Sequence, residues 1–452
     1  MRPFLTVRKW IEEYGPLVTV RSGTQKVVYI GRHKAAMDIM EKQGRSSADR
    51  PRQIAAGEIL SGEQSVAFTH AGERFRRMRR ALHSHLHPNA ADKYQPLQMS
   101  YMKNVVHAIL DDPDNFQNHA LTFTASTIMS VAYGKTAPTF ANDPEVRSVR
   151  QRFVALSKAM RPGAYLVDSI PWLKHIPWYG RELREEFETN KRFYTGQLNH
   201  VKQQIRDNED ISSSFSKYML ENNHLYDFSE TEVAFLAGGF IVAGMHSIAV
   251  TIATMLMAAA CFPDEQAKVQ AELDAVIRSH QAPTFDDEQS LPRLQAFINE
   301  VHRWRPLAPE GVAHRMTEDV IWENYCIPAG TTVIGNIWAI SRDPDVFPEP
   351  DAFKPDRWLN DQGRLKEDLK FYPFGFGRRV CPGRHLAQRA VFIHTLVVLW
   401  AFQLTLDRTK PLNDLGYMNA VMPDDRQCHI GFKTRIPETE LRRMMQNYPA
   451  TA

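Results

Sequence analysis

The sequence predicts a mainly α-helical fold with small β-sheets. Residues 119–226 repeat their apolar positions with the period of a helix over most of their length. Two short strand-like runs, 17–20 and 26–30, flank a turn at 22–23 and predict a hairpin. Residues 233–262 contain no Asp, Glu, Lys or Arg, so they form either a helix that crosses a membrane or one that is buried in a core.

The remaining elements follow in chain order. An amphipathic helix over 5–14 precedes the hairpin, and a helix over 33–43 follows it. Residues 46–68 have no clean period and contain Gly, Ser and Pro, so we expect a long mobile loop. Prolines and tryptophans interrupt the helical middle at 162–163 and 170–178 and indicate a lid with an apolar surface. Later in the chain we expect a loop over 283–292, a strand over 331–336, and helices over 264–279, 295–304 and 390–406.

Composition and charge limit the class of protein. The chain has 452 residues, of which 43% are hydrophobic, and this is ample for a large core. Its formal charge of +3 is too weak to argue for a nucleic-acid partner. The four cysteines are far apart and have no paired spacing, so we expect a reduced, cytosol-facing protein without a zinc site or a disulfide framework.

One of these cysteines stands in a glycine-rich stretch, 371–383, just before a predicted helix over 385–400. Gly375 and Gly377 allow a tight backbone that can approach a flat ligand closely. Cys381 would face the unpaired N–H groups at the start of the helix, which favour a thiolate, the form that binds metals. For a cysteine considered alone, a small buried hydrophobic residue is the alternative.

The spacing Phe-x-x-Gly-x-Arg-x-Cys-x-Gly is formed by Phe374, Gly377, Arg379, Cys381 and Gly383. This spacing resembles the haem-binding loop of the cytochrome P-450 superfamily, and the resemblance covers nearly the whole chain. It implies a single haem-binding domain of the cytochrome P-450 fold over 1–452. It also implies that the Cys381 thiolate holds the iron of heme b (iron protoporphyrin IX), with Phe374 and Gly377 at the cofactor and Arg379 paired with a propionate.

Two further stretches resemble elements of the same family. The Glu-x-x-Arg element is matched by Glu300 and Arg303, which share one helical face because they are three residues apart. The Pro-x-Arg element is matched by 355–357, so Arg357 is implied to join the pair. The implied role is structural, a buried charge cluster that fixes the segment carrying the cysteine loop. A solvated surface ion pair is the alternative for Glu300 and Arg303 taken alone.

The resemblance assigns two more haem contacts. Residues 72–80 contain five arginines, and Arg79 matches an arginine that contacts a haem propionate in the family. Phe75 stands where the family has a tryptophan, so the indole donor is lost. The other arginines would form a positive face for a redox partner, with a solvated basic face as the alternative. His314 matches a histidine on a propionate, with a surface histidine as the alternative.

The charge-free run matches the central helix of the family, which is buried over the haem, and this account is preferred to a membrane span. Relatives that cleave dioxygen read Ala-Gly-x-Asp/Glu-Thr here, where the small pair opens a groove for oxygen and the acid and alcohol relay protons. Ser247 keeps a hydroxyl and His246 replaces the acid, so these two join Cys381 as candidate catalytic residues. His246 is interpreted as a core hydrogen-bonding residue, a modified proton relay or a substrate contact.

The same resemblance implies a substrate pocket lined by Ala243, Gly244, Ala308, Glu310 and Met418. The apolar residues 164–167 resemble the lid region of fungal secondary-metabolism members, and in membrane-bound relatives the lid also enters the bilayer. Such relatives usually begin with a membrane anchor, whereas this chain begins directly in a helix, so we suspect a truncation. The native form is expected on the cytosolic face of the endoplasmic reticulum membrane.

The implied function is a haem-thiolate monooxygenase that oxidises a lipophilic small molecule with dioxygen and with electrons from an NADPH-dependent cytochrome P-450 reductase. Residues 311–315 and 336–344 resemble a fungal branch similar to O-methylsterigmatocystin oxidoreductase, which implies a fungal natural-product intermediate as substrate. The loss of the acid at His246 leaves an alternative open, an atypical member that catalyses dehydrogenation, ring formation, oxidative coupling or rearrangement without net oxygen insertion. A haem-binding protein without enzymatic activity is the third hypothesis.

Overall fold

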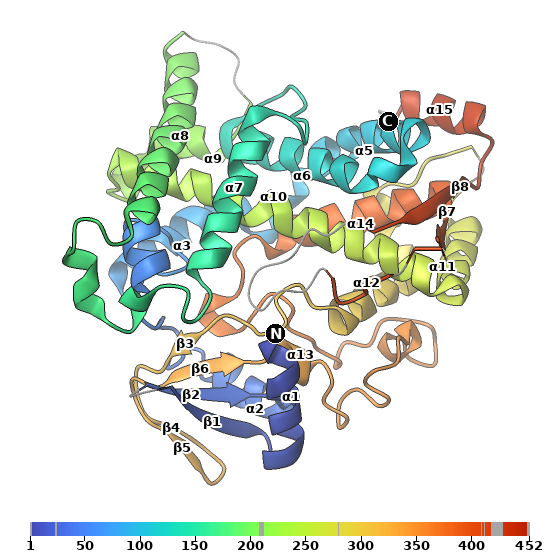
Figure 1. Cartoon of the computed structure of the whole chain (residues 1–452). Helices are drawn as coiled ribbons and strands as arrows, with labels where there is room; N and C mark the ends of the chain where they lie inside the picture. Colours follow the sequence, from blue (N-terminus) through green and yellow to red (C-terminus); the bar gives the residue numbers. More distant parts are fainter. Residues whose placement is uncertain are drawn as a thin grey trace.

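The computed structural model describes residues 2–22, 25–207, 212–278, 280–407, 409–410, 412–416 and 428–449. It is mainly helical with small β-sheets, which confirms the predicted fold class. Figure 1 shows the long helices in one body above a small sheet region that contains the N-terminal segment. The α-helices are α1 Pro3–Tyr14, α2 His33–Ala36, α3 Glu73–Leu86, α4 Pro88–Asp92, α5 Gln95–Asp111, α6 Phe116–Tyr133, α7 Pro144–Ala159, α8 Arg181–Arg206, α9 Phe215–Asn222, α10 Glu230–Cys261, α11 Pro263–Val276, α12 Pro292–Trp304, α13 Ile337–Ile340, α14 Arg384–Ala401 and α15 Glu438–Gln446.

The strands of the described residues form three small sheets. The largest has the order β1-β2-β6-β3, while β4 pairs with β5 and β7 pairs with β8. All neighbours are antiparallel except β2 and β6, which run parallel. The strands are β1 Leu17–Ser22, β2 Gln25–Ile30, β3 His314–Arg315, β4 Val320–Trp322, β5 Tyr325–Ile327, β6 Thr332–Gly335, β7 Phe402–Leu406 and β8 Ile430–Thr434.

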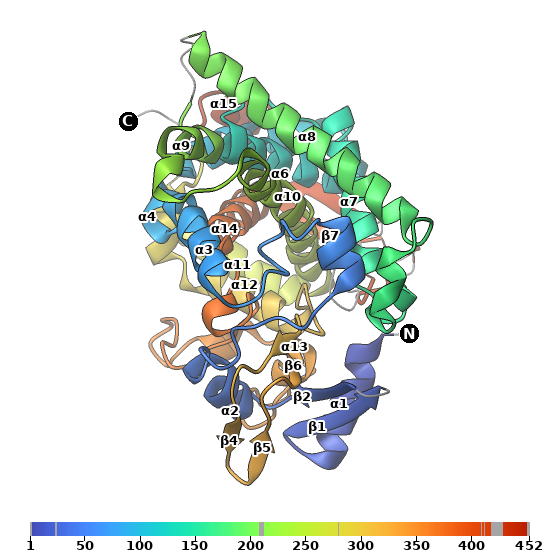
Figure 2. The same ribbon diagram turned by 90° about the vertical axis from the view of Figure 1, so that its left-hand side faces the viewer.

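The N-terminal hairpin forms as predicted, with Leu17 opposite Ile30 in the antiparallel pair. The predicted turn falls partly on residue 23, which lies outside the described residues. Helix α1 covers this sheet, and Figure 2 shows the two side by side. Its buried residues recur at helical spacing, Phe4, Val7 and Ile11, and they pack against α13. This amphipathic pattern explains why a helix forms directly at the start of the described chain.

Helix α10 is the centre of the helical body. It begins with a capping box in which Ser229 Oγ accepts a hydrogen bond from the backbone N–H of Glu232, and Glu232 Oε2 accepts one from the backbone N–H of Ser229. Helices α6, α8 and α14 pack around it. Within the described part of the chain it is the one helix long and apolar enough to cross a membrane, yet 72% of its apolar window is buried inside the protein. Protein neighbours therefore account for its lack of charge.

Two predictions of secondary structure were wrong in part. Within residues 46–68, predicted as a long mobile loop, Ile54–Leu60 forms a π-helix whose apolar side chains are buried against Tyr165 and Leu183, while the rest of the stretch is turns and irregular chain. The predicted helix over 390–406 ends early, and Phe402–Leu406 is strand β7, paired with β8. Both runs are apolar enough to be buried in either form. The partner that each segment meets, a helix surface or another strand, decides between the forms.

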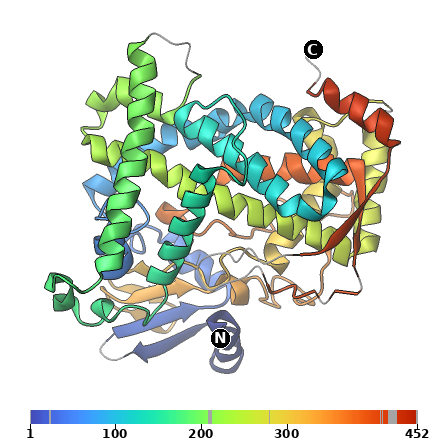
Figure 3. The ribbon, with the colours of Figure 1, turned by 45° about the horizontal axis from the view of Figure 1, so that its top comes forward.

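The helical middle is confirmed as α6 to α9, with 3₁₀ turns at Leu166–Asp168 and Pro171–His175. The connector between α7 and α8 leaves Leu166, Trp172 and Trp178 exposed by 61%, 63% and 73%. Figure 3 shows it as the green chain at the lower end of the long helix α8. The predicted lid region thus has an apolar outer surface.

Candidate functional site

A cavity of about 320 Å³ lies between α10, the start of α14 and helices α3, α7 and α8. Its walls are mostly apolar, with side chains such as Leu82, Phe240 and Leu386. Four arginines also line it: Arg50, Arg79, Arg152 and Arg379. None of the described lining residues is an aspartate or a glutamate. Such a chamber suits a lipophilic ligand that also carries negative groups.

Cys381 lies at the edge of this cavity, two residues before the N-cap of α14. Its backbone N–H donates to the carbonyl of Phe374 at 2.9 Å, which closes the glycine-rich loop. Gly375 and Gly377 have φ angles of +82° and +54°, the left-handed region that side chains disfavour. At Gly377 a Cβ atom would lie 2.6 Å from the carbonyl oxygen of Met40. The loop conformation therefore depends on both glycines.

The surroundings of Cys381 act on the pKa of its thiol in opposite directions. Burial raises the pKa of the thiol, although the backbone N–H of Gly383 and the charges of Arg79 and Arg384 lower it. The helix start was expected to favour a thiolate, but the loss of hydration outweighs it. A metal ion at the sulfur would supply the positive charge that reverses this balance.

Three of the cavity arginines lie together at the Cys381 end. Burial lowers the pKa of Arg50 to about 9, and repulsion by Arg379 lowers it further. Burial likewise lowers the pKa of Arg379 to about 10, with a further contribution from Arg79. The Arg379 guanidinium also stacks 3.6 Å above the ring of Phe75, the residue that replaces the family tryptophan. Asp49 offsets only part of this repulsion, because both pKa values stay lowered, so the cluster favours a further anion.

These residues fit the haem that the motifs imply. A haem presents an iron that a thiolate can ligate, a flat apolar ring and two propionates at one edge. Cys381 would ligate the iron, the apolar walls would enclose the ring, and Arg79 and Arg379 would pair with the propionates. Arg50 extends this set and was missed by sequence analysis, because an arginine in a stretch without a period gives no signal of its own.

The other predicted cofactor residues do not line the cavity. Buried His314 lies near Arg50 and Arg379, and its Nδ1 is 2.7 Å from the carbonyl of Ser47. Burial, together with those arginines, lowers the pKa of His314 to about 3, so its ring is neutral near pH 7. Phe374 packs on His302, with ring centroids 5.9 Å apart. Neither side chain, nor Gly377, is among the residues that line the cavity.

Helix α10 brings Ala243, Gly244 and Ser247 to the cavity wall. A Cβ atom on Gly244 would lie 2.8 Å from Cδ1 of Ile128, so glycine allows α10 to lie close to α6. The Ser247 hydroxyl donates to the carbonyl of Ala243 at 2.5 Å. Its oxygen lone pairs are thereby left for a donor from the cavity.

His246 is not among the residues that line the cavity. It is 4% exposed, and its ring lies 5.3 Å from the ring of Phe153 on α7. Successive helical residues are turned by about 100°, so a neighbour of a cavity residue can face another helix. This placement favours the interpretation of His246 as a core residue over those of a proton relay or a substrate contact.

Glu300 and Arg303 lie fully buried on α12. Arg303 Nε and Nη2 donate to the two oxygens of Glu300 at 2.8 and 2.7 Å. The same carboxylate accepts hydrogen bonds from the backbone N–H of Lys354, Nε of Arg357 and Nε1 of Trp358, at 2.7, 3.2 and 3.0 Å. One carboxylate thus joins α12 to the segment that leads to the cysteine loop.

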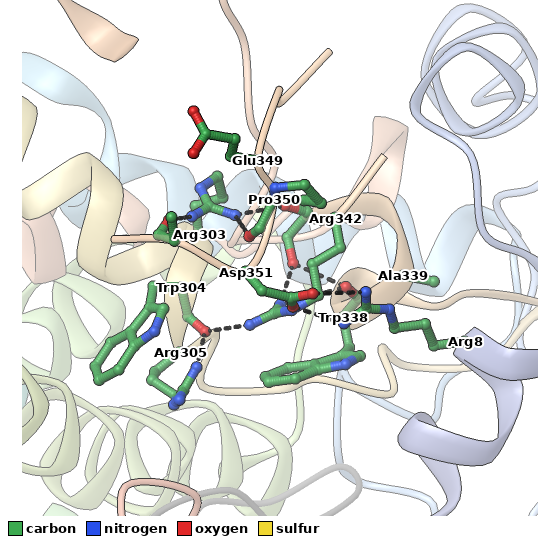
Figure 4. A network of polar contacts seen from close by, with 12 residues as sticks. Arg8, Arg303, Trp304, Arg305, Trp338, Ala339, Arg342, Glu349, Pro350 and Asp351 are labelled. Atoms are coloured by element: carbon green, nitrogen blue, oxygen red, sulfur yellow. Dashed lines mark hydrogen bonds and ion pairs between the residues drawn. The ribbon is translucent and has the colours of Figure 1, made fainter. Parts of the chain in front are cut away.

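A second network extends this joint towards the N-terminal helix (Figure 4). Arg303 Nη1 donates to the carbonyl of Pro350 at 2.6 Å, and the adjacent Asp351 accepts hydrogen bonds from Arg8 and Arg342. Arg342 lies over the ring of Trp338 at 3.2 Å. The network joins α1, α12 and α13 to the loop that contains Pro350 and Asp351. The sheet region, through α1, and the segment that leads to the cysteine loop, through Glu300, are therefore both held to α12.

The predicted pocket residues divide into three groups. Ala243 and Gly244 line the cavity, whereas Ala308 and Glu310 do not. Glu310 is buried, and burial raises the pKa of its carboxyl group. Met418 lies outside the described residues. Sequence analysis missed Arg152 and Asn190, which line the cavity from α7 and α8, because only the fold brings those helices to the site.

Comparison with known proteins identifies the family. The family model for cytochrome P450 matches residues 1–428. Cytochrome P450 monooxygenase 113 of Postia placenta is 44% identical over 438 residues, which cover 97% of this chain and 88% of that protein. Cytochrome P450 monooxygenase FrzL of a Cladobotryum species is 33% identical, with 89% of this chain and 76% of that protein covered. The fold matches that of a zebrafish cytochrome P450 solved with progesterone, with a TM-score of 0.80, 23% identity, and coverage of 96% and 100% of the two chains.

The chain belongs to the cytochrome P450 family, and the resemblance stated from its motifs is confirmed. Members of this family are haem-dependent oxidoreductases, and the similar fungal proteins are named as monooxygenases.

Proposed function

We propose that this protein is a haem-thiolate monooxygenase that oxidises a lipophilic small molecule, a fungal natural-product intermediate. Its electrons come from NADPH through a cytochrome P450 reductase. The observation that supports this most is one cavity that has Cys381 at its edge, Ser247 on its wall and apolar side chains elsewhere. The similar fungal monooxygenases support the same class of reaction.

A thiolate-ligated haem in this cavity supplies the activation of dioxygen. The residues of the chain then have separate tasks. Cys381 ligates the iron, Arg50, Arg79 and Arg379 neutralise the propionates, and the apolar walls bind the substrate and exclude bulk water. Ser247 Oγ, which donates to the Ala243 carbonyl at rest, would rotate to donate its proton to the cavity and take a replacement proton from an adjacent water molecule.

A second candidate is an atypical member that dehydrogenates, couples, cyclises or rearranges its substrate without net oxygen insertion. The specific observation in its favour is that the described cavity lining contains no carboxylate beside Ser247, and that His246 lies outside it. Proton delivery would then depend on Ser247 and ordered water alone.

For the native protein we propose a position on the cytosolic face of the endoplasmic reticulum membrane. The exposed residues of the α7–α8 connector, Leu166, Trp172 and Trp178, support contact with a bilayer, because tryptophan prefers the membrane–water interface. Arg76 and Arg80 on α3, with side chains 63% and 62% exposed, support an acidic redox partner.

The test uses the haem-loaded protein with a reductase, NADPH and ¹⁸O-labelled dioxygen, over a panel of fungal metabolites. Label in a product, detected by mass spectrometry, is expected. A converted product without label would favour the second candidate. Cys381→Ala is expected to lose the spectrum of a thiolate-ligated, carbon-monoxide-bound ferrous iron, while Cys326→Ala on an exposed site keeps it. Retention of that spectrum in Cys381→Ala would refute the assignment.

A further inference from the structure

Arg152 on α7 is a buried cation with few partners. The side chain is 4% exposed, and its Nη2 donates to Ser148 Oγ at 2.9 Å. Its Nε and Nη1 atoms are buried and have no hydrogen-bond acceptor among the described residues. No carboxylate in the described part of the chain forms an ion pair with it. Its guanidinium lies 4.2 Å from the ring centre of Phe193 and 5.5 Å from that of Tyr194.

Stability alone does not explain an arginine at this place. Burial of an unpaired cation is costly, and the two ring contacts offset only part of that cost. An apolar side chain of similar size would fill the site more favourably. The arginine therefore points to a missing anion.

The missing anion has access from the cavity. Arg152 lines the same cavity as Cys381, and so do Asn190 and Tyr194, which are four residues apart on one face of α8. Asn190 is 8% exposed, and its Oδ1 is buried without a partner among the described residues. A buried guanidinium and a buried amide thus both line the α7–α8 side of a mostly apolar chamber.

Charge in the cavity supports the same conclusion. The lining carries four arginines and, among the described residues, no acidic side chain. Arg379 interacts with Arg50 and with Arg79 at the Cys381 end, where the two haem propionates would fit, and Asp49 offsets part of the charge of Arg50 and Arg379. Arg152 comes from α7, and no acidic side chain of the described residues forms an ion pair with it. The haem does not account for it.

We propose that the substrate carries a carboxylate that binds Arg152 and Asn190 and orients its apolar remainder towards Cys381. The proposal rests on the function proposed above and narrows its substrate to lipophilic carboxylic acids. The unpaired N–H groups of Arg152 at Nε and Nη1 offer charge-assisted hydrogen bonds to a carboxylate oxygen. The Nδ2 group of Asn190 supplies a further donor, whereas its unpaired Oδ1 is an acceptor and binds a donor such as water rather than the carboxylate. A fixed distance between this anchor and the iron selects which carbon is oxidised.

The test measures binding by isothermal titration calorimetry with the haem-loaded protein. The probes are dodecanoic acid and dehydroabietic acid, each compared with the alcohol of the same carbon skeleton. The wild type is expected to bind at least one acid more tightly than its alcohol. Arg152→Gln is expected to weaken binding of that acid roughly 30-fold and to change binding of the alcohol less than about twofold.

Two further variants separate an anchor from a structural role. Asn190→Asp places a negative charge beside Arg152 and should abolish the preference for the acid, even if Arg152→Gln folds poorly. Arg147→Gln, on the exposed side of α7, should change neither binding constant. The proposal is overturned if no acid binds more tightly than its alcohol, or if Arg152→Gln weakens acid and alcohol equally. A wild-type protein without the thiolate-ligated haem spectrum would instead refute the proposed function.

Discussion

Replacement of Glu300 by glutamine tests whether one buried carboxylate holds the cysteine-loop segment to α12. Glutamine has nearly the same shape, but it is neutral and presents an N–H₂ group where Glu300 has an acceptor oxygen. All five hydrogen bonds at this carboxylate come from donors: Arg303 Nε and Nη2, Lys354 N, Arg357 Nε and Trp358 Nε1. The glutamine amide would therefore face donors and leave at least one of them unpaired.

The expected loss of stability is large because no water reaches the pair. Glu300 and Arg303 both have side chains that are 0% exposed, so Arg303 would become a buried cation without its counter-ion. Removal of one partner from such a pair costs about 3–5 kcal/mol. Since typical unfolding free energies are about 5–15 kcal/mol, Glu300→Gln should lose roughly a fifth or more of the total.

The assay is urea unfolding at pH 7, followed by far-ultraviolet circular dichroism, with the free energy of unfolding compared between variants. Glu349→Gln is the matched control, because Glu349 pairs with Lys354 in the same segment but both side chains are exposed. Its effect should stay within about 1 kcal/mol. If Glu300→Gln also stays within about 1 kcal/mol of the wild type, the cluster does not hold the segment and the reasoning is wrong.

Three other predictions concern a core histidine, the proton donor and the membrane. Burial lowers the pKa of His394 to about 3, and neither of its ring nitrogens has a hydrogen-bond partner among the described residues. Because the unfolded pKa is about 6.5, the stability from a neutral His394 is complete above pH 6.5 and is lost as the pH falls, at up to about 1.4 kcal/mol per pH unit. His394→Leu should therefore unfold with a shallower acid dependence between pH 7 and 5 in urea titrations, and an unchanged dependence would contradict this. Ser247→Ala should lower the ratio of product formed to NADPH consumed by about tenfold, as expected for loss of a proton-transfer group, while His246→Gln keeps it within about twofold; equal losses would restore His246 as a relay. Trp172→Ser combined with Trp178→Ser should weaken the binding constant for phosphatidylcholine vesicles, measured by co-sedimentation, by tenfold or more. The reason is that burial of each tryptophan contributes about 1.5–3 kcal/mol to binding. An unchanged binding constant would exclude this surface as the membrane contact.

Much of the prediction rested on short-range features of the sequence. These features are the glycines around Cys381, the three-residue interval between Glu300 and Arg303, and the charge-free run that corresponds to α10. Their physical causes act within a loop or a helical turn, so the sequence is sufficient to indicate them. The fold class and the cytochrome P450 family followed from these features and are confirmed.

Other features depended on which surfaces meet. The sequence could not distinguish strand β7 from a continued helix, or the π-helix Ile54–Leu60 from a loop, because the same apolar residues are buried in either form. It could not decide whether His246 faces the cavity or α7, because that depends on how α10 is rotated against its neighbours.

The sequence by itself determined the motif on which the proposed haem ligation at one end of the cavity rests, because Cys381, Arg379 and the glycines on either side of them share a single loop. Only the tertiary structure decided the other end. Arg152 and Asn190 come from two helices whose packing brings their buried polar groups to one chamber. Contacts between segments far apart in the chain leave no local periodicity, so the sequence identifies the cofactor loop and the fold decides what the substrate meets.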